Sequence, residues 1–448
     1  MHRPTPHPLA LAVLASLLQV PAQAALYEVD PGPYLPENGH FAAWYQDTHG
    51  RVLDLCLSKA VSSRAAGAPG APSYMCTLLP TPGVFDDAAP IEFPGNFPDE
   101  AFWFTADASI VDAARGIDLD FGTAIEAAFS VEEPIDGDQI SFARVRIRVD
   151  VPVAGTYVIT HPYGVDVFDV PAGGRRAINM TRDIGIGAPK TYTGALKGDV
   201  GPFLRSVNGP YTETNPATGA SERYIGDPNL TEAVTGSPFN TNFVRIEGPN
   251  GIDLRTELFS ISGKLSDVKR PTPMIPLRST YSRHTENGDL RAQQDVFVMA
   301  PPVPATVTLV SQTPNLALTE ANSTGAWYAQ SALNPTLPVS LHVTADNQLA
   351  IPGSAAANAY LPLTDLVTIT RAEYSLASGQ LTLVATTSDE VSPPALSAST
   401  GNGAVIGSLS GDGALKTLTT GLSPIPPATV RVTSANGGSD SEDVVLVP

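Results

Sequence analysis

Cysteine, histidine and positive charge are all scarce in this sequence, and each shortage excludes a class of function. The 448 residues include two cysteines, seven histidines, and 26 Lys and Arg against 45 Asp and Glu, a formal net charge of −19. So acidic a chain is a poor partner for nucleic acids and anionic membranes. The scattered histidines have no zinc-site spacing. No G-x-S-x-G, H-E-x-x-H or phosphate-loop motif occurs, so these hydrolase and nucleotide-binding signatures are absent.

Long apolar runs are also scarce, and the one that occurs lies near the N-terminus. Arg3, the apolar stretch Leu9–Val20 and the small-residue pattern Ala22-Gln23-Ala24 form a secretory signal with cleavage after Ala24. The run is too short to span a membrane. We therefore predict a signal peptide at residues 1–24, no transmembrane segment, and export to the periplasm or the extracellular space.

The two cysteines, Cys56 and Cys76, are predicted to form a disulfide. They lie 20 residues apart, and exported proteins mature in an oxidising compartment. A bridge that closes a loop of this size stabilises a fold by roughly 3 kcal/mol. A pair of buried free thiols is the alternative.

Proline and glycine are plentiful, with 42 and 38 residues, which favours short strands and turns over long helices. The clearest strand pair lies in Ser141–Thr160, where SFARVRIRVD alternates apolar and arginine residues before a turn leads into TYVIT. This alternation predicts a β-hairpin. The best helix candidate is Ile117–Phe129, because its apolar residues recur near one helical face.

An internal repeat divides the C-terminal part of the chain. Asp295–Ala300 corresponds to Gln380–Ala385, and Pro338–Thr344 to Pro427–Thr433, at offsets of 85 and 89 residues. Two strand-rich repeats of this length are typical of immunoglobulin-like (Ig-like) sandwiches.

We therefore predict a mainly β, multidomain fold with four parts after the signal peptide. Residues 25–135 form an N-terminal region with the disulfide and a short helix, and residues 136–268 form a central β-sandwich-like domain. Residues 269–350 and 363–448 form two tandem Ig-like β-sandwiches, joined by a linker.

Several segments together resemble a known group of proteins: Tyr45-Gln46-Asp47, Leu55-Cys56-Leu57, His161–Gly164, Asp183–Gly187, Tyr224–Asn229 and Phe243–Pro249. The chain is similar over most of its mature length to uncharacterised secreted bacterial proteins with Ig-like repeats towards the C-terminus. This resemblance implies export and the modular architecture, and it implies no activity.

Arg144, Arg146 and Arg148 are the sharpest candidate for a binding site. At alternate strand positions their side chains share one face, roughly 6.5–7 Å apart. Three guanidinium groups in a row can hold a sulfated or carboxylated polymer through paired hydrogen bonds, and Phe142 would add an apolar contact if it shares their face. The competing interpretation is that the arginines pair with the chain's own Asp and Glu on neighbouring strands.

Two acidic pairs, Asp118 with Asp120 and Asp136 with Asp138, have a spacing compatible with Ca²⁺ ligands. Neither completes an EF-hand loop, which needs more oxygen ligands and a distal Glu. Solvated acidic turns are the competing interpretation. The sequence suggests no cofactor other than Ca²⁺.

Aromatic residues gather at Trp44-Tyr45 and Phe102-Trp103-Phe104. They would form either part of the core or a platform on which glycan rings stack. Core packing is the commoner role of clustered aromatics.

Export, missing catalytic motifs and appended β-modules favour a secreted, non-enzymatic binding or surface-interaction protein. Its expected partners are envelope or extracellular proteins, or polysaccharide. The alternative is an extracellular enzyme that acts on a polymer such as a glycan, with its active site in residues 25–265. The glycine-rich stretch Gly185–Gly251 favours this alternative, because long ordered loops often carry sites. No catalytic residue can be named from the sequence.

Overall fold

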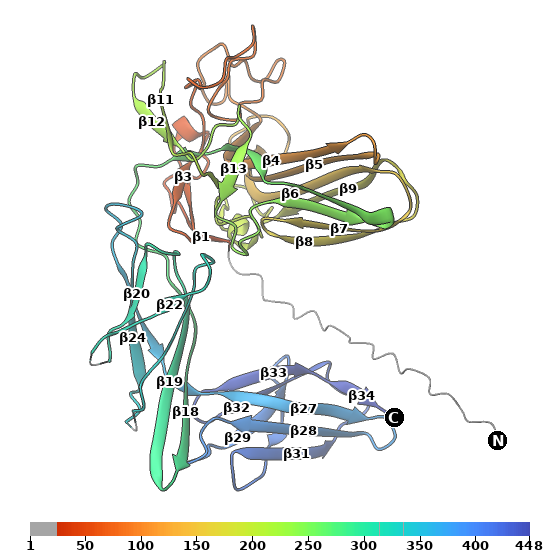
Figure 1. The fold of residues 1–448 in the computed structure, drawn as a ribbon, viewed down its shortest axis with the longest axis vertical. Coiled ribbons are helices and arrows are strands. Elements are labelled where there is room, and N and C mark those ends of the chain that lie inside the picture. The colour runs from red at the N-terminus through yellow and green to blue at the C-terminus, as the bar shows by residue number, and fades with distance from the viewer. Residues whose placement is uncertain (1–24, 313, 335) are drawn as a thin grey trace, which may run out of the picture.

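The computed structural model describes residues 25–448 except 313 and 335, and nearly all of its regular structure is β-strand (Figure 1). The predicted signal peptide therefore lies outside the described residues. In this part of the chain, no helix is long and apolar enough to cross a membrane. The only helical elements described are short 3-10 turns: η1 (Pro36–Asn38), η2 (Thr193–Lys197) and η3 (Pro249–Gly251).

The N-terminal domain, residues 25–265, contains three antiparallel sheets. The six-stranded sheet has the order β1 (Leu26–Val29), β2 (Trp44–Asp47), β3 (Val52–Asp54), β17 (Lys264–Leu265), β12 (Ser221–Tyr224) and β11 (Tyr211–Thr214). The seven-stranded sheet has the order β10 (Arg205–Ser206), β13 (Glu232–Thr235), β16 (Leu258–Ser262), β4 (Glu100–Asp112), β5 (Ile117–Phe129), β6 (Gln139–Val151) and β9 (Gly174–Ile184). The four-stranded sheet has the order β15 (Ile252–Thr256), β14 (Val244–Gly248), β7 (Gly155–His161) and β8 (Gly164–Val170).

The seven-stranded sheet organises this domain, because its long central strands alternate between a buried inner face and a polar outer face. On β5 and β6 the inner residues Leu119, Phe121, Val145 and Ile147 are at most 2% exposed. They share one hydrophobic cluster with Ile159 and other residues of the four-stranded sheet. The two strands predicted in Ser141–Thr160 are present as β6 and β7, but the predicted hairpin was wrong. β6 pairs with β5 and β9, whereas β7 pairs with β8 and β14 in a different sheet, because the turn between them carries the chain from one sheet to the other.

The helix predicted over Ile117–Phe129 was wrong, because this segment is strand β5. Its first half alternates strictly, with Ile117 and Leu119 buried and Asp118 exposed. Apolar residues four positions apart fit both the strand period of two and, approximately, the helical period of 3.6. In the second half nearly every residue is buried on either face, so the alternation that identifies a strand disappears there.

The boundary predicted at residue 135 falls inside the N-terminal domain. β5 and β6 lie on either side of it and pair along their whole length, from Asp118 with Asp150 to Phe129 with Gln139. Residues from both predicted units, including Trp103 and Val145, belong to the same core cluster. Residues 25–135 and 136–268 therefore form one packed unit.

The predicted disulfide is present. Cys56 and Cys76 are bonded, with Cα atoms 5.3 Å apart, and no free cysteine occurs in the described chain. Both residues are buried in a small cluster with Met75 and Tyr224, so the bridge joins the loop to the six-stranded sheet.

Two β-sandwiches follow the N-terminal domain, as the internal repeat predicts. The first sandwich packs the sheet β22 (Thr319–Glu320), β23 (Ala326–Gln330), β19 (Asp289–Met299), β18 (Ile275–Glu286), β26 (Thr364–Asp365) against β21 (Leu316–Ala317), β20 (Thr306–Leu309), β24 (Ser340–Asp346), β25 (Ala357–Pro362). The second sandwich packs β31 (Leu415–Gly421), β28 (Gln380–Thr387), β27 (Val367–Ser375), β34 (Val445–Val447) against β30 (Val405–Ser408), β29 (Leu396–Thr400), β32 (Thr429–Ser434), β33 (Ser439–Asp443). Each has its own core cluster.

The repeated sequence segments occupy equivalent strands in the two sandwiches. β19 and β28 pair with the first strand of their sandwich, and β24 and β32 are central in the opposite sheet. In both sandwiches the last strand runs parallel to the first, as β26 beside β18 and β34 beside β27. The expected linker before residue 363 instead contains β25, which pairs with β24. The first sandwich therefore ends at β26, directly before β27.

Both domain junctions are bonded. In Figure 1 the first sandwich lies between the N-terminal domain and the second sandwich. Asn347 donates a hydrogen bond to the backbone carbonyl of His49 at 3.1 Å across the first junction. At the second, buried Asp389 accepts hydrogen bonds from Tyr281 and Arg283, both at 3.0 Å.

Candidate functional site

The outer face of the seven-stranded sheet carries the predicted arginine row on β6. Strand register places Arg144 between Ala124 of β5 and Asp183 of β9. Arg146 lies between Gly122 and Thr181, and Arg148 between Asp120 and Asn179. The three arginines therefore share one face, as predicted, but their neighbours differ.

Arg144 is paired within the protein. Its guanidinium donates to both carboxylate oxygens of Asp183, at 2.7 and 3.0 Å, and lies 2.9 Å from a carboxylate oxygen of Glu126. Glu126 is buried, and burial raises the pKa of its carboxyl while Arg144 opposes the shift. Arg144 thus follows the competing interpretation, in which the arginines neutralise the chain's own acids.

Arg146 and Arg148 have no ion pair with any residue that the structure describes. Arg146 makes one long hydrogen bond, from Nε to Thr181 Oγ1 at 3.4 Å. The Nε atom of Arg148 is buried with no hydrogen-bond partner. Burial and the like charges of Arg144 and Arg148 lower the pKa of Arg146. These two guanidiniums keep donors free for a ligand.

The two arginines line an open, polar depression with a volume of about 580 Å³, here called the sheet groove. Four neighbouring strands supply most of its side chains, and residues of the flanking segments supply the rest. The lining residues include Asp107, Ser109, Asp120, Gly122, Arg146, Arg148, Thr231, Thr256, Leu258 and Ser260.

Asp107 and Asp120 provide the negative side of the sheet groove. Asp107 lies opposite Gly122 in the register, and a Cβ atom at Gly122 would come within 2.8 Å of Asp107 Oδ1. Water reaches the Asp107 side chain, yet the protein atoms crowded around it raise the pKa of its carboxyl to about 6. The charge of Asp120 adds to this shift and Arg146 opposes it.

The sheet groove combines the polar groups that bind sugars. Carboxylates accept hydrogen bonds from hydroxyl groups, guanidiniums donate to hydroxyl, carboxylate or sulfate oxygens, and serine and threonine do either. Its open shape suits a segment of an extended polymer better than an enclosed small molecule.

The sheet groove does not include the remaining predicted ligand residues. Phe142 is 3% exposed, and the Arg144 guanidinium lies 4.9 Å from its ring centre, so the ring is not accessible for stacking. Asp118 lies near the start of β5, whereas Asp136 and Asp138 lie in the loop beyond its end.

The acidic pairs are therefore not brought together. Asp136 pairs with Lys190 at 2.7 Å, and Asp138 accepts a hydrogen bond from Ser130 at 3.0 Å. Within the described residues, no group of three or more His, Cys, Asp or Glu side chains is arranged to hold a metal ion.

The clustered aromatic residues belong to the core, as the commoner role implies. Trp44, Tyr45, Phe102, Trp103 and Phe104 are all at most 8% exposed. Tyr45 and Trp103 pack edge to face with ring centres 4.8 Å apart.

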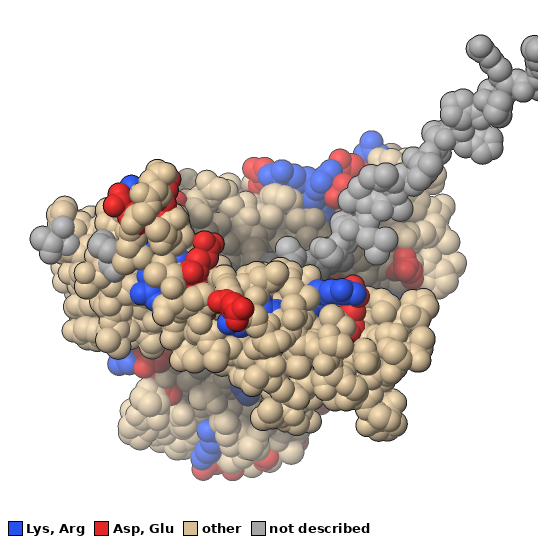
Figure 2. Space-filling model, turned by 90° about the horizontal axis from the view of Figure 1, so that it is seen from below, with Lys and Arg blue, Asp and Glu red and all other residues tan. Residues whose placement is uncertain are grey.

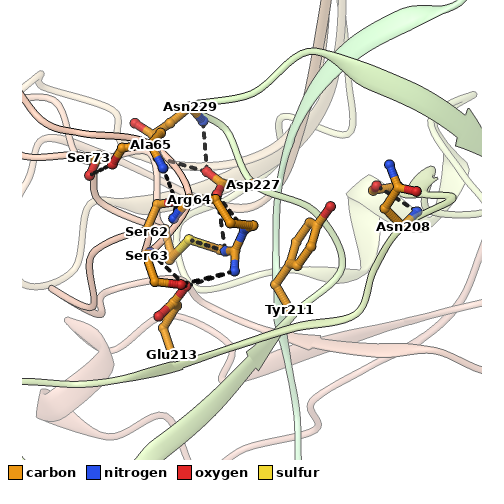
Figure 3. Close-up of polar contacts among 12 residues, drawn as sticks. Ser62, Ser63, Arg64, Ala65, Ser73, Asn208, Tyr211, Glu213, Asp227 and Asn229 are labelled. Atoms are coloured by element: carbon orange, nitrogen blue, oxygen red, sulfur yellow. Dashed lines mark hydrogen bonds and ion pairs between the residues drawn. The ribbon is translucent and has the colours of Figure 1, made fainter.

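A second polar cluster lies between the disulfide loop and the segment that contains β11 and β12 (Figure 3). Arg64 pairs with Glu213 at 2.9 Å and with Asp227 at 3.1 Å, and its guanidinium lies 3.9 Å from the Tyr211 ring centre. Ser62 donates to the same Asp227 carboxylate. Because Arg64 of the loop bonds to carboxylates of this segment, the cluster fastens the loop to it.

Sequence reasoning missed Asp107, Ser109 and Ser260 of the sheet groove. They come from β4 and β16, which lie far from the arginines in the sequence. Only the strand order brings them to the same face. A partial signal was the alternation of polar residues along Asp107-Ala108-Ser109.

Charge of one sign does not dominate the face of the molecule seen in Figure 2. Basic and acidic side chains there lie next to one another in small mixed groups. Recognition on this face would therefore depend on local contacts.

No protein-family model and no curated protein match the chain. A solved structure that is similar in part is the Bacteroides ovatus mixed-linkage glucan utilization locus protein SGBP-B, in complex with a mixed-linkage heptasaccharide. The two chains are 12% identical, and the match covers 55% of this chain and 59% of that one with a TM-score of 0.18.

Proposed function

We propose that this chain is an exported, non-enzymatic binding protein that holds a polysaccharide in the sheet groove. The observation that carries the proposal is the pair Arg146 and Arg148, which line the groove without an internal carboxylate partner. The disulfide supports export, because such bonds persist in oxidising compartments.

The chemistry of the sheet groove favours a glycan over a protein partner. Protein interfaces usually have an apolar core, and among the side chains lining this groove Leu258 is the main apolar one on the outer face. A glycan with carboxylate or sulfate groups would supply the acceptors that the two guanidiniums lack, and its hydroxyl groups would bond to Asp107 and Asp120.

The test is glycan binding by the Arg146→Ala/Arg148→Ala variant, measured by calorimetry with acidic and neutral glycans. We expect the wild-type protein to bind an acidic glycan and the variant to lose about tenfold or more in affinity, because each charged hydrogen bond is worth roughly 1.5–3 kcal/mol.

The matched control is Arg371→Ala/Arg431→Ala, which removes the same charge from the second sandwich. Arg371 pairs with Glu373 on the surface, and Arg431 bonds to Ser439. Equal affinities in both double variants and the wild type would refute the proposal.

A second candidate function is polymer hydrolysis in the same groove. The observation that favours it is the pair of carboxylates, Asp107 and Asp120, of which Asp107 has its pKa raised to about 6. Glycosidases use two carboxylates of unequal pKa, one as an acid and one as a base or nucleophile. Release of reducing ends from soluble polysaccharides, lost in Asp107→Asn and Asp120→Asn, would support this candidate over simple binding.

A further inference from the structure

A second recess lies at the junction of the N-terminal domain and the first sandwich, apart from the sheet groove. Its volume is about 200 Å³, below the roughly 300–1,000 Å³ of pockets that enclose whole drug-sized ligands. Gly50–Val52 and Arg205 contribute from the N-terminal domain, and Ala350–Pro352 contribute from the sandwich. We call it the junction recess. Its size fits one charged group or a single sugar ring.

The junction recess is strongly basic in an otherwise acidic chain. Five of the 26 Lys and Arg residues line it, and no Asp or Glu does. The five are Arg51, Arg205, Arg223, Lys269 and Arg270. Arg51, Arg205 and Arg270 are partly buried, while Arg223 and Lys269 are exposed.

Three of these five cations have no side-chain partner in the described chain. Arg270 is paired with Glu28, and Arg223 lies 3.8 Å from Asp267. Arg51, Arg205 and Lys269 make no side-chain hydrogen bond or ion pair with any residue that the structure describes.

The neighbouring acid offsets the positive charge of the recess only in part. Asp47 is buried close to Arg51, but its two oxygens accept hydrogen bonds from the backbone amides of Arg51 at 2.8 Å and Phe203 at 2.9 Å. Burial lowers the pKa of Arg51 and lowers that of Arg205 to about 10. The Arg51 charge adds to the second shift, and the charge of Asp47 opposes both shifts.

Guanidiniums without a side-chain partner in a partly desolvated recess are costly unless an anion binds them. Arginine is the residue best suited to such a site, because its planar fork matches the oxygens of carboxylate, sulfate and phosphate groups.

We propose that the junction recess binds an oxyanionic group, carboxylate, sulfate or phosphate, through Arg51 and Arg205, with Lys269 at its rim. The bound group contacts walls from two domains, so its binding fixes the first sandwich against the N-terminal domain. This site is separate from the sheet groove and does not depend on the function proposed for it.

The experiment is calorimetric titration of the protein with inorganic sulfate, inorganic phosphate and glucuronate, each at constant ionic strength. We expect saturable binding of at least one probe to the wild type. Binding of the inorganic ions alone would identify a free anion as the occupant, and binding of glucuronate would identify an acidic sugar.

Three variants, Arg51→Gln, Arg205→Gln and Lys269→Gln, test the residues, and a fourth, Arg371→Gln, is the control. We expect Arg205→Gln and Lys269→Gln to weaken binding, the former by about tenfold or more, and Arg371→Gln on the second sandwich to bind as the wild type does. Arg51→Gln removes the more buried guanidinium, and if it fails to fold, the other two variants decide. Absence of saturable binding, or wild-type affinity in both Arg205→Gln and Lys269→Gln, would overturn the proposal.

The Arg146→Ala/Arg148→Ala variant separates the two sites. It should keep the anion affinity of the wild type while losing glycan binding. Loss of anion binding in this variant would place the anion in the sheet groove and overturn the junction site.

Discussion

Asp107 controls the net charge of the sheet groove. Because its pKa is raised to about 6, Asp107 is protonated at about pH 5 and ionised at about pH 7.5. The groups that face it are Asp120 on β5, Arg146 and Arg148 on β6, and Ser260 on β16. These side chains carry one net positive charge when Asp107 is protonated and none when it is ionised.

We therefore expect affinity for an acidic glycan to fall a few-fold as the pH rises through about 6, because an added negative charge repels the ligand. The Asp107→Asn variant mimics the protonated state, so its affinity should stay high across this range. Calorimetry at both pH values measures this difference. The same pH dependence in the variant would contradict the assignment to Asp107.

Asp389 is one of the residues that bond the second sandwich to the first. Its carboxylate accepts hydrogen bonds from Tyr281 and Arg283 across the junction and from the backbone amide of Ser392 at 2.9 Å. Replacing it with Ala removes the acceptor of these donors, of which Tyr281 is buried and Arg283 partly buried. We expect Asp389→Ala to destabilise the protein by about 2 kcal/mol.

Chemical denaturation measures the free energy of unfolding of Asp389→Ala, and Glu373→Ala is the variant with which it is compared. Glu373 forms a surface ion pair with the half-exposed Arg371, and such pairs contribute at most about 1 kcal/mol. Equal destabilisation by the two variants would mean that the junction bonds contribute no more than a surface pair.

At the scale of single elements, the disulfide loop depends on two independent restraints. The Cys56–Cys76 bond closes a separation of 20 residues, and Arg64 anchors the loop to Glu213 and Asp227. Replacing both cysteines with serine should cost roughly 3 kcal/mol. In a domain of this size, that lowers the melting temperature by roughly 6–12 °C.

Differential scanning calorimetry can resolve which domain the cysteine variant affects. We expect the transition of the N-terminal domain to move down and those of the sandwiches to stay in place. Movement of a sandwich transition would mean that the domains do not unfold independently.

Strands could be predicted from the sequence where one face of the sheet is buried and the other is exposed, because the residues then alternate between apolar and polar. The arginine strand alternates over its whole length, so β6 and the shared face of its arginines were predicted correctly. β5 lost this signal because Ala127 and Glu126 are both buried on opposite faces. The charge of the chain favoured internal pairing of the arginines, which holds for Arg144 alone.

The candidate sites could be predicted only in part, because strand order and domain contacts assemble them. Asp120 was noted as a possible metal ligand, yet its neighbour across the sheet is Arg148. The junction recess joins Arg51, Arg205 and Lys269 from three distant segments. No local pattern in the sequence connects such positions.

At the scale of the whole molecule, His49 links the stability of the first junction to pH. Its side chain is buried, and both ring nitrogens lack hydrogen-bond partners. Burial lowers its pKa to about 3, and the charges of Arg51 and Arg205 add to the shift. In the unfolded chain the pKa of histidine is about 6.5.

The unfolded state therefore binds the proton more tightly, and stability falls as the pH drops from about 6.5 towards 3, by about 4 kcal/mol in total. A His49→Gln variant should lose this part of the pH dependence. Denaturation curves at several pH values measure how the free energy of unfolding depends on pH. The control is Arg115→Gln, because Arg115 is exposed in a turn and paired with Asp112. An unchanged slope in His49→Gln would refute the role of His49.

The parallel pairing of the last strand with the first has a mechanical consequence for the two sandwiches. A pull transmitted along the chain enters the first sandwich at the start of β18 and leaves it at the end of β26. Because these strands run parallel, the pull slides one along the other and loads their hydrogen bonds together. An antiparallel pair loaded at one end would instead open one bond at a time. β27 and β34 repeat the arrangement in the second sandwich. Tension along the chain therefore acts on two parallel strand pairs in series, and it loads the hydrogen bonds of each pair in shear.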